Sequence, residues 1–167
     1  MLLASCVPDR RIMSRKMSKM SRTNSIAPSI LVVEDELLVR MLTESILMEA
    51  GYETLSASDV SEAIAILRSD ADIDVLFTDI GLRSAIHGGL EIARKAVRLR
   101  PSIHVVYASA RSVTDRMRSG FVEGSRFLVK PYRKAQVLEA LSQWERVKRN
   151  DYSNNEAISD LRPDHRL

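Results

Sequence analysis

The sequence contains one cysteine, Cys6, so it cannot form an intrachain disulfide, and we expect a reducing, cytoplasmic setting. Aromatic residues are scarce, at 5%, so aliphatic side chains must fill most of the core that a hydrophobic content of 45% allows. No apolar run approaches the ~20 residues that a membrane span requires, which argues against a membrane protein. These absences leave a globular chain of 167 residues, a length that suits one domain with short tails.

Positive charge is distributed unevenly along the chain. Residues 1–29 carry six Lys or Arg and one Asp, a net charge of +5, so the total of +3 leaves −2 for residues 30–167. The basic segment is polar and aperiodic, which is typical of disorder. Basic segments can contact nucleic acid or anionic lipid, but we interpret this one as a solvated leader. We therefore predict a disordered leader over residues 1–28 and no binding to DNA or membranes.

From Ile30 onward, short apolar runs alternate with segments of helical period. Wholly apolar runs are typical of strands buried on both faces of a parallel sheet. Helix ends are indicated by Asp59 as an N-cap with Glu62 three residues later, and by Gly51 after the first helix. Ser112 is the expected cap of the fourth helix. The expected strands lie near residues 30–33, 52–57, 75–77, 103–108 and 127–129, and the helices near residues 37–49, 59–67, 89–100, 112–120 and 133–148.

The first and last expected helices have amphipathic patterns. The last helix has Val137, Leu138, Leu141 and Trp144 on its expected inner face. The first has a stripe at helical spacing made of Leu37, Leu38, Met41, Leu42, Ser45, Ile46 and Glu49.

Short connections and right-handed crossovers predict an α/β fold: a doubly wound five-stranded parallel sheet with helices on both faces. The folded domain is expected over residues 29–148, followed by a polar tail over residues 149–167. In such folds the site lies at the carboxyl ends of the strands.

Polar side chains directly follow four of the apolar runs. Glu34 and Asp35 follow the first, and Asp79 follows the third. Ser109 follows the fourth, and Lys130 follows the fifth. The carboxyl ends of parallel strands share one edge of a sheet, so this pattern gathers three carboxylates, a hydroxyl and an ammonium.

Three carboxylates within ~5 Å of one another repel by roughly 3 kcal/mol per pair at an effective dielectric constant near 20. A hard divalent cation relieves this repulsion, and a sparse set of carboxylates suits Mg²⁺. A carboxylate beside such a metal can act as a nucleophile and form an aspartyl phosphate. The lysine and the hydroxyl would then hold the phosphoryl oxygens.

Four motifs at these strand ends resemble those of response-regulator receiver domains of bacterial two-component systems. The spacing is also similar, since Asp79 lies 44 residues after Asp35 and 51 before Lys130. The resemblance covers about residues 29–147 and implies the flavodoxin-like receiver fold. The motifs are Val-Val-Glu-Asp-Glu (32–36), Phe-Thr-Asp-Ile (77–80), Tyr-Ala-Ser-Ala (107–110) and Phe-Leu-Val-Lys-Pro-Tyr (127–132).

The resemblance implies a role for each acid of the cluster. Asp79 matches the phosphoacceptor, and Asp35 matches the direct Mg²⁺ ligand. Glu34 matches an acidic neighbour that acts on the metal through water. The backbone carbonyl of Gly81 matches the third protein ligand.

The remaining matches concern the response to phosphorylation. Lys130 matches the lysine that pairs with the phosphate, and Ser109 the hydroxyl switch. Phe127 stands at the aromatic switch position, where plain core packing is the competing interpretation. The resemblance also implies that the Lys130–Pro131 peptide is cis, which X-Pro bonds permit at a cost of only ~0.5–1 kcal/mol.

The sequence departs from the family pattern in the loop over residues 81–89, which lacks the usual Pro-Gly and has one or two extra residues. This departure puts the loop geometry and the rate of phosphate loss in doubt. His87 in this loop is expected to be solvated rather than catalytic.

The resemblance implies a non-enzymatic signalling protein. Its donor would be a sensor histidine kinase or a phosphotransfer protein. Its output would be a downstream protein bound at the face of the fourth helix, fifth strand and fifth helix, and the same face can support a homodimer.

Three alternatives compete with a stand-alone receiver. A phosphatase of the haloacid-dehalogenase type would need a second Asp at position 81, where the chain has Gly81. A DNA-binding output domain is not expected, because 19 residues follow Lys148. A pseudo-receiver would be expected to lose some of the acids or the lysine, all of which are present.

Overall fold

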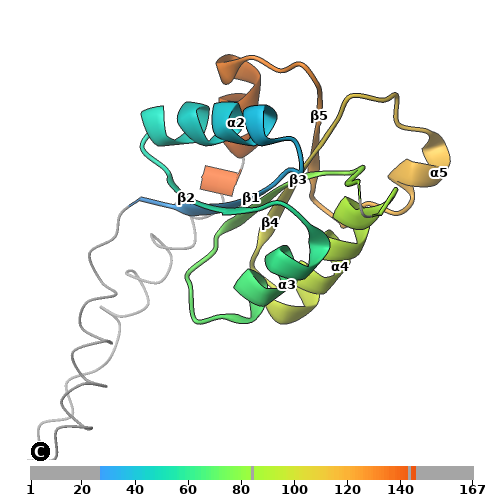
Figure 1. The fold of residues 1–167 in the computed structure, drawn as a ribbon, viewed down its shortest axis with the longest axis horizontal. Coiled ribbons are helices and arrows are strands. Elements are labelled where there is room, and N and C mark those ends of the chain that lie inside the picture. Colours follow the sequence, from blue (N-terminus) through green and yellow to red (C-terminus); the bar gives the residue numbers. More distant parts are fainter. Residues whose placement is uncertain (1–26, 84, 143, 146–167) are drawn as a thin grey trace, which may run out of the picture.

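The computed structural model describes residues 27–83, 85–142 and 144–145. Its core is a five-stranded, all-parallel sheet in the order β2-β1-β3-β4-β5 (Figure 1). The strands are β1 (Ser29–Val33), β2 (Glu53–Ala57), β3 (Val75–Asp79), β4 (His104–Ser109) and β5 (Arg126–Val129). The helices are α2 (Leu37–Glu49), α3 (Val60–Arg68), α4 (Gly88–Leu99) and α5 (Asp115–Arg118), and residues 134–142 are also helical.

The helices cover both faces of the sheet. The helix α2 and the helical residues 134–142 lie on one face, and α3 and α4 lie on the other (Figure 1). This arrangement confirms the predicted doubly wound fold. The predicted leader over residues 1–28 and tail over residues 149–167 lie almost entirely outside the described residues.

Alternate side chains of β1 are buried in two separate hydrophobic cores, one on each face of the sheet. Ile30 and Val32 are fully buried in a cluster with Leu47 of α2, while Leu31 and Val33 pack with Leu67 of α3 on the other face. A strand buried on both faces needs an unbroken apolar run, which explains the sequence pattern. Among the described residues, no helix has the length and hydropathy needed to cross a bilayer.

The register of the sheet aligns the strand ends. Val33 lies beside Thr78, Asp79 beside Ala108, and Ser109 beside Val129. The chain leaves β1 to form β2 on one side and later returns to place β3 on the other, so the topological switch point lies between β1 and β3. The residues that follow these two strands therefore border the crevice where such folds bind ligands.

Local capping explains several helix boundaries. The Asp59 carboxylate accepts the Glu62 N–H at 2.9 Å, as predicted for the start of α3. Gly51 follows α2 with a φ of 90°, a conformation that favours glycine. The predicted start of the fourth helix was wrong: α5 is capped by Thr114, whose hydroxyl accepts the Met117 N–H, and spans only four residues.

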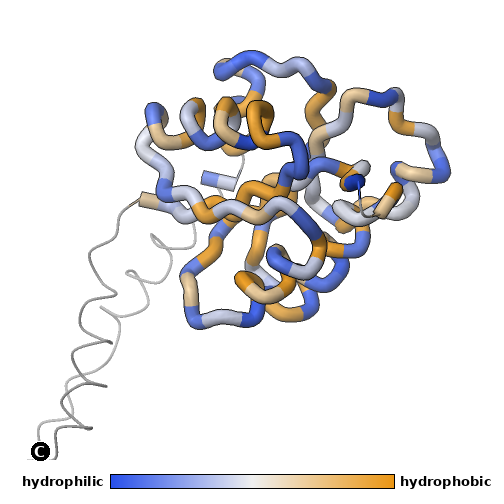
Figure 2. The backbone as a smooth tube through the Cα atoms, viewed as in Figure 1, coloured by the Kyte–Doolittle hydropathy of each residue, from blue (hydrophilic) through white to orange (hydrophobic). Residues whose placement is uncertain are grey.

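An amphipathic pattern would suggest that the apolar stripe of α2 faces the sheet, but most of the stripe is exposed, and Ile46 is its member that packs partly buried against the core. Thr43 and Leu47 are the buried residues of this helix. The Thr43 hydroxyl bonds to the Val39 carbonyl at 2.8 Å and to the Tyr132 hydroxyl at 2.6 Å, so a polar residue can occupy the inner face. The tube of Figure 2 shows hydrophobic residues along the strands and on α2. Exposed on α2 are Leu37 (57%), Leu38 (74%), Met41 (55%), Leu42 (55%) and Met48 (55%).

Candidate functional site

Three carboxylates meet at the ends of β1 and β3. Oxygen atoms of Glu34, Asp35 and Asp79 all lie within 4.8 Å of one another. Glu34 is buried, and the other two are partly buried. Carboxylate oxygens at this spacing are donors for a hard divalent cation, so the residues present fit Mg²⁺.

Lys130 enters the same cluster from the end of β5. Its ammonium lies 2.9 Å from Asp79 Oδ2 and also contacts Glu34 Oε2, and its side chain is only 12% exposed. The Lys130 N–H donates to the Ser109 carbonyl at 2.8 Å, which fixes the lysine beside the end of β4. The Lys130–Pro131 peptide is cis, as predicted.

Burial and charge shift two pKa values in this cluster. Burial raises the pKa of Glu34 above its ordinary value, and the hydrogen bond and charge of Lys130 offset only part of the rise. Burial alone would lower the pKa of Lys130, but its contacts with Glu34 and Asp79 outweigh burial and raise it. Lys130 is therefore protonated at neutral pH and compensates for part of the negative charge.

Asp35 has a cationic partner that sequence reasoning missed. Asp35 Oδ2 lies 3.0 Å from Arg83 Nε and accepts the Arg83 backbone N–H at 3.2 Å. Arg83 belongs to the loop between β3 and α4, 48 residues along the chain. No local pattern marks such a long-range pair.

A cavity of about 440 Å³ opens beside Asp79. Asp79, Gly81 and Ser109 all line it, so the structure brings these three predicted site residues together. The Gly81 N–H donates to Asp79 Oδ1 at 3.3 Å, and the Ser109 hydroxyl accepts the Arg111 N–H at 3.1 Å. His87 is exposed at the rim, in agreement with the expectation of a solvated histidine.

The backbone at the end of β3 is packed closely against a glycine at the start of α4. A Cβ placed on Gly89 would lie 2.0 Å from the Asp79 carbonyl oxygen. The Gly89 N–H donates to the Ile80 carbonyl at 3.2 Å. Only glycine allows the helix to approach the end of β3 this closely, and the approach fixes the backbone that carries Asp79.

Phe127 does not line the cavity beside Asp79. It is half-buried on β5, where its ring centroid lies 6.0 Å from that of Phe121 and 5.7 Å from the Arg118 guanidinium carbon. Tyr107 is fully buried next to Phe127 in the register of β4 and β5, and its ring lies 4.3 Å from Phe121. The packing of Phe127 in this aromatic cluster therefore accounts for its position.

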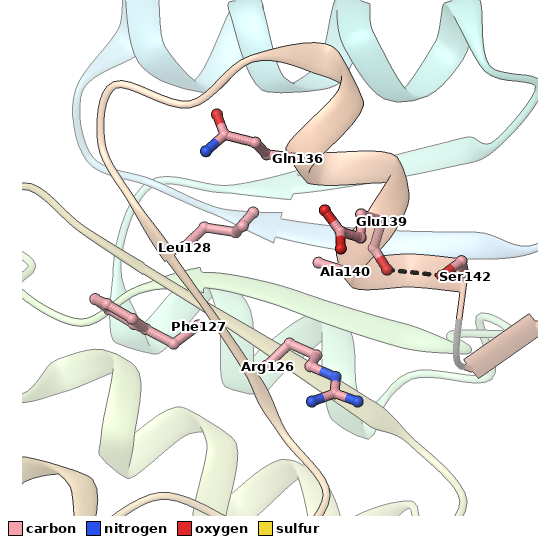
Figure 3. Close-up of a pocket in the computed structure, with 7 residues that line it drawn as sticks. All are labelled: Arg126, Phe127, Leu128, Gln136, Glu139, Ala140 and Ser142. Carbon is pink, nitrogen blue, oxygen red and sulfur yellow. Dashed lines mark hydrogen bonds between the residues drawn. The ribbon is translucent and has the colours of Figure 1, made fainter.

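A second pocket, of about 350 Å³, lies between β5 and the helical residues 134–142 (Figure 3). Phe127 and Leu128 contribute from the strand, and Gln136 and Glu139 from the helix. This pocket lies on part of the face that the sequence resemblance assigned to output.

Comparison with known proteins gives a consistent result. The family model described as "Response regulator receiver domain" matches residues 30–142. The chemotaxis protein CheY of Thermotoga maritima is 25% identical over 116 residues, covering 68% of this chain and 94% of that protein. The crystal structure of a response regulator receiver protein from Sinorhizobium medicae WSM419 is 34% identical, with a TM-score of 0.66 over 71% of this chain and 94% of that chain.

Other relatives are longer proteins. The aerobic respiration control protein ArcA of Escherichia coli (strain K12) is 31% identical over 106 residues, which is 63% of this chain but 43% of that protein. The chain thus spans less than half the length of several of the curated relatives that it matches.

Proposed function

The chain belongs to the family of response regulator receiver domains, and we propose that it accepts a phosphoryl group on Asp79 in an Mg²⁺-dependent reaction. The observation that carries this proposal is the position of Asp79, whose carboxylate lies between two other acids and Lys130. Receiver domains are signalling domains, and we propose that this one is a phosphoacceptor rather than an enzyme that turns over a substrate.

The two oxygens of Asp79 have different surroundings. Oδ2 is held by Lys130 at 2.9 Å, and Oδ1 accepts the Gly81 N–H at 3.3 Å next to the cavity. An Asp79 oxygen forms the new bond to phosphorus, while the bond from phosphorus to the donor breaks and its electron pair stays with the leaving group. Lys130 then pairs with the phosphoryl oxygens, and the Ser109 hydroxyl, which lines the same cavity, donates to one of them.

Asp35, Asp79 and the backbone carbonyl of Gly81 would hold the metal directly, and Glu34 would act through a water molecule. When bound, Mg²⁺ would neutralise the negative charge that accumulates on the carboxylates and the phosphoryl oxygens. The three carboxylates fit this role because their oxygen atoms already converge. Burial raises the pKa of Glu34, so a nearby cation favours its ionised form.

Receiver domains interact with histidine kinases or phosphotransfer proteins, and we propose a donor of this kind here. The exposed apolar side chains of α2 support a protein donor, since this helix begins two residues after Asp35. A contiguous apolar patch beside a reactive group is typical of an interaction surface. A donor that packs on α2 would bring its phosphoryl group to the strand ends.

We further propose that output uses the face of α5, β5 and the helical residues 134–142, which correspond to the expected fourth helix, fifth strand and fifth helix. Phosphorylation adds charge at the ends of β3 and β4, and Ser109 turns toward it. Phe127 lies on β5, beside Tyr107 of the strand that ends at Ser109, so a change at Ser109 can shift the packing of the aromatic cluster. A downstream protein, or a second copy of the chain, would then bind one packing better than the other.

The direct test is incubation with a small-molecule phosphodonor and Mg²⁺, followed by intact mass measurement. The wild type is expected to gain one phosphoryl group, and Asp79→Ala none. Asp72→Ala is the matched control, because Asp72 is an exposed aspartate outside the cluster. Equal labelling of Asp79→Ala and the wild type would reject Asp79 as the acceptor, and failure of the wild type to label would favour a pseudo-receiver.

A further inference from the structure

The loop between β3 and α4 is tied to a residue of the acidic cluster. Two nitrogens of Arg83 contact Asp35 Oδ2: the backbone N–H donates a hydrogen bond at 3.2 Å, and Nε forms an ion pair at 3.0 Å. Asp35 is only 15% exposed, whereas the Arg83 side chain is 80% exposed. The Arg83 guanidinium therefore covers Asp35 from the solvent side, and its side chain can move away into solvent.

The loop backbone holds Arg83 in position to make this contact. Leu82 and Ala85 exchange two backbone hydrogen bonds, at 2.9 and 3.2 Å, which close a tight turn around Arg83. The Leu82 side chain is buried, with 3% exposure, and anchors the turn to the core. The position of Arg83 thus follows from a defined turn rather than from the reach of a long side chain.

Each of the three acids of the cluster contacts one of two cations. Lys130 contacts Glu34 and Asp79, and Arg83 contacts Asp35. Asp35 is the acid without a contact to Lys130 among the described ion pairs, so its negative charge is balanced chiefly from the loop. A divalent cation that binds Asp35 is therefore repelled at short range by the positive charge of Arg83.

We propose that Arg83 is an internal counter-ion of Asp35 that competes with the divalent cation, so that metal binding releases the Arg83 guanidinium from Asp35. This inference rests on the proposed function, because it takes Asp35 to be a metal ligand. The effect of Arg83 is to weaken metal binding and to couple metal binding to the conformation of the loop. Arg83 and Ile86 both line the cavity beside Asp79, so the release of Arg83 alters the wall of the cavity that receives the phosphoryl group.

The expected size of the effect follows from exposure. Ion pairs with a solvent-exposed partner contribute about 0.2–1 kcal/mol, which corresponds to a factor of about 1.4–5 in an equilibrium constant. Removal of the charge in Arg83→Gln should therefore tighten Mg²⁺ binding by about threefold at low ionic strength. High salt should reduce the difference, because exposed charges are screened.

The test is a calorimetric Mg²⁺ titration of the wild type, Arg83→Gln and Arg111→Gln. Arg111 lines the same cavity but has no ion pair with the acids among the described contacts. Arg111→Gln thus removes an equal charge without the pair and should tighten binding by less than half as much. In parallel, the Arg83 Nε–H and backbone N–H signals are followed by NMR, and both should shift with the same midpoint as the calorimetric binding.

Each outcome of the titrations and the NMR measurement supports or overturns the counter-ion role of Arg83. Equal or weaker Mg²⁺ binding by Arg83→Gln, equal effects of the two variants, or Arg83 signals that do not respond to saturating Mg²⁺ would overturn the counter-ion role. If such a result accompanies normal labelling of Asp79, the proposed function stands and only this inference fails. If neither the wild type nor Arg83→Gln binds Mg²⁺, both the inference and the metal dependence fail together.

Discussion

Replacing Lys130 with methionine leaves three converging carboxylates without the ammonium that separates two of them. Removal of one partner of a buried ion pair typically costs about 3–5 kcal/mol, because the other charge stays buried and unpaired. The side chains of Lys130 and Glu34 are 12% and 5% exposed, so we expect a loss of about 3 kcal/mol at pH 7, the lower end of this range. For a domain of this size the melting temperature should fall by roughly 10 °C.

The variant should also respond to pH in a characteristic direction. The folded-state pKa of Glu34 is already raised by burial, and Lys130→Met removes the contacts that lower it. A carboxyl whose pKa is raised by folding binds more protons in the folded state, so stability increases as pH falls toward and through that pKa. We therefore expect Lys130→Met to regain part of its lost stability between pH 7 and pH 5, relative to the wild type.

Urea and thermal unfolding at both pH values measure these effects. Lys134→Met is the control, since Lys134 pairs with Glu49 at 3.0 Å but the two side chains are 47% and 63% exposed. Such a surface pair should contribute less than about 1 kcal/mol, with little dependence on pH. The reasoning is refuted if the two variants lose equal stability at pH 7, or if Lys130→Met gains nothing over the wild type on acidification.

Four further experiments probe other parts of the molecule. Asp35→Ala should weaken Mg²⁺ binding more than any other single change in the cluster, and wild-type affinity in a calorimetric titration would reject Asp35 as a direct ligand. Deletion of residues 1–28 should leave the melting temperature and phosphorylation unchanged, whereas a large fall would show that this segment packs on the domain. Gly89→Ala should lower stability by about 1–3 kcal/mol, because the new methyl group meets the carbonyl at the end of β3 at 2.0 Å; unchanged unfolding in urea would contradict the close approach. Beryllofluoride, a mimic of the phosphoryl group, should shift amide NMR signals of residues 110–135 more than those of residues 52–70, and shifts confined to the metal ligands would count against the proposed output face.

The sheet and the convergence of its polar ends could be predicted from the sequence because both depend on local order. An apolar run that is buried on both faces must lie in the middle of a parallel sheet, and the residue after it must stand at the carboxyl edge. Glu34 and Asp79 each follow such a run, and Lys130 follows the strand at the edge of the sheet, so the topology alone predicts that the three side chains lie close together. The ion pairs of Lys130 with Glu34 and Asp79 result from this convergence of the strand ends.

The orientation of α2 could not be predicted in the same way. Its apolar residues favour one side, yet Thr43 occupies the inner face because the Tyr132 hydroxyl, 89 residues away, bonds to it. The pair of Arg83 with Asp35 likewise joins segments 48 residues apart through a loop that departs from the family pattern. The orientation of α2 and the pair of Arg83 with Asp35 both depend on contacts between residues far apart in the sequence. The hydrophobic periodicity of one segment cannot predict such contacts.

The hydrogen bond between Thr43 and Tyr132 has a consequence for how related sequences can vary. Each hydroxyl is buried or nearly so and bonds to the other at 2.6 Å, so the loss of either would disturb the partner. Thr43 retains the Val39 carbonyl as a second partner, but Tyr132 has no second one among the described hydrogen bonds. Double substitution to a β-branched aliphatic residue at 43 and phenylalanine at 132 would remove both polar groups at little cost in shape. We therefore expect the two positions to covary in homologues, with phenylalanine at 132 wherever position 43 is aliphatic.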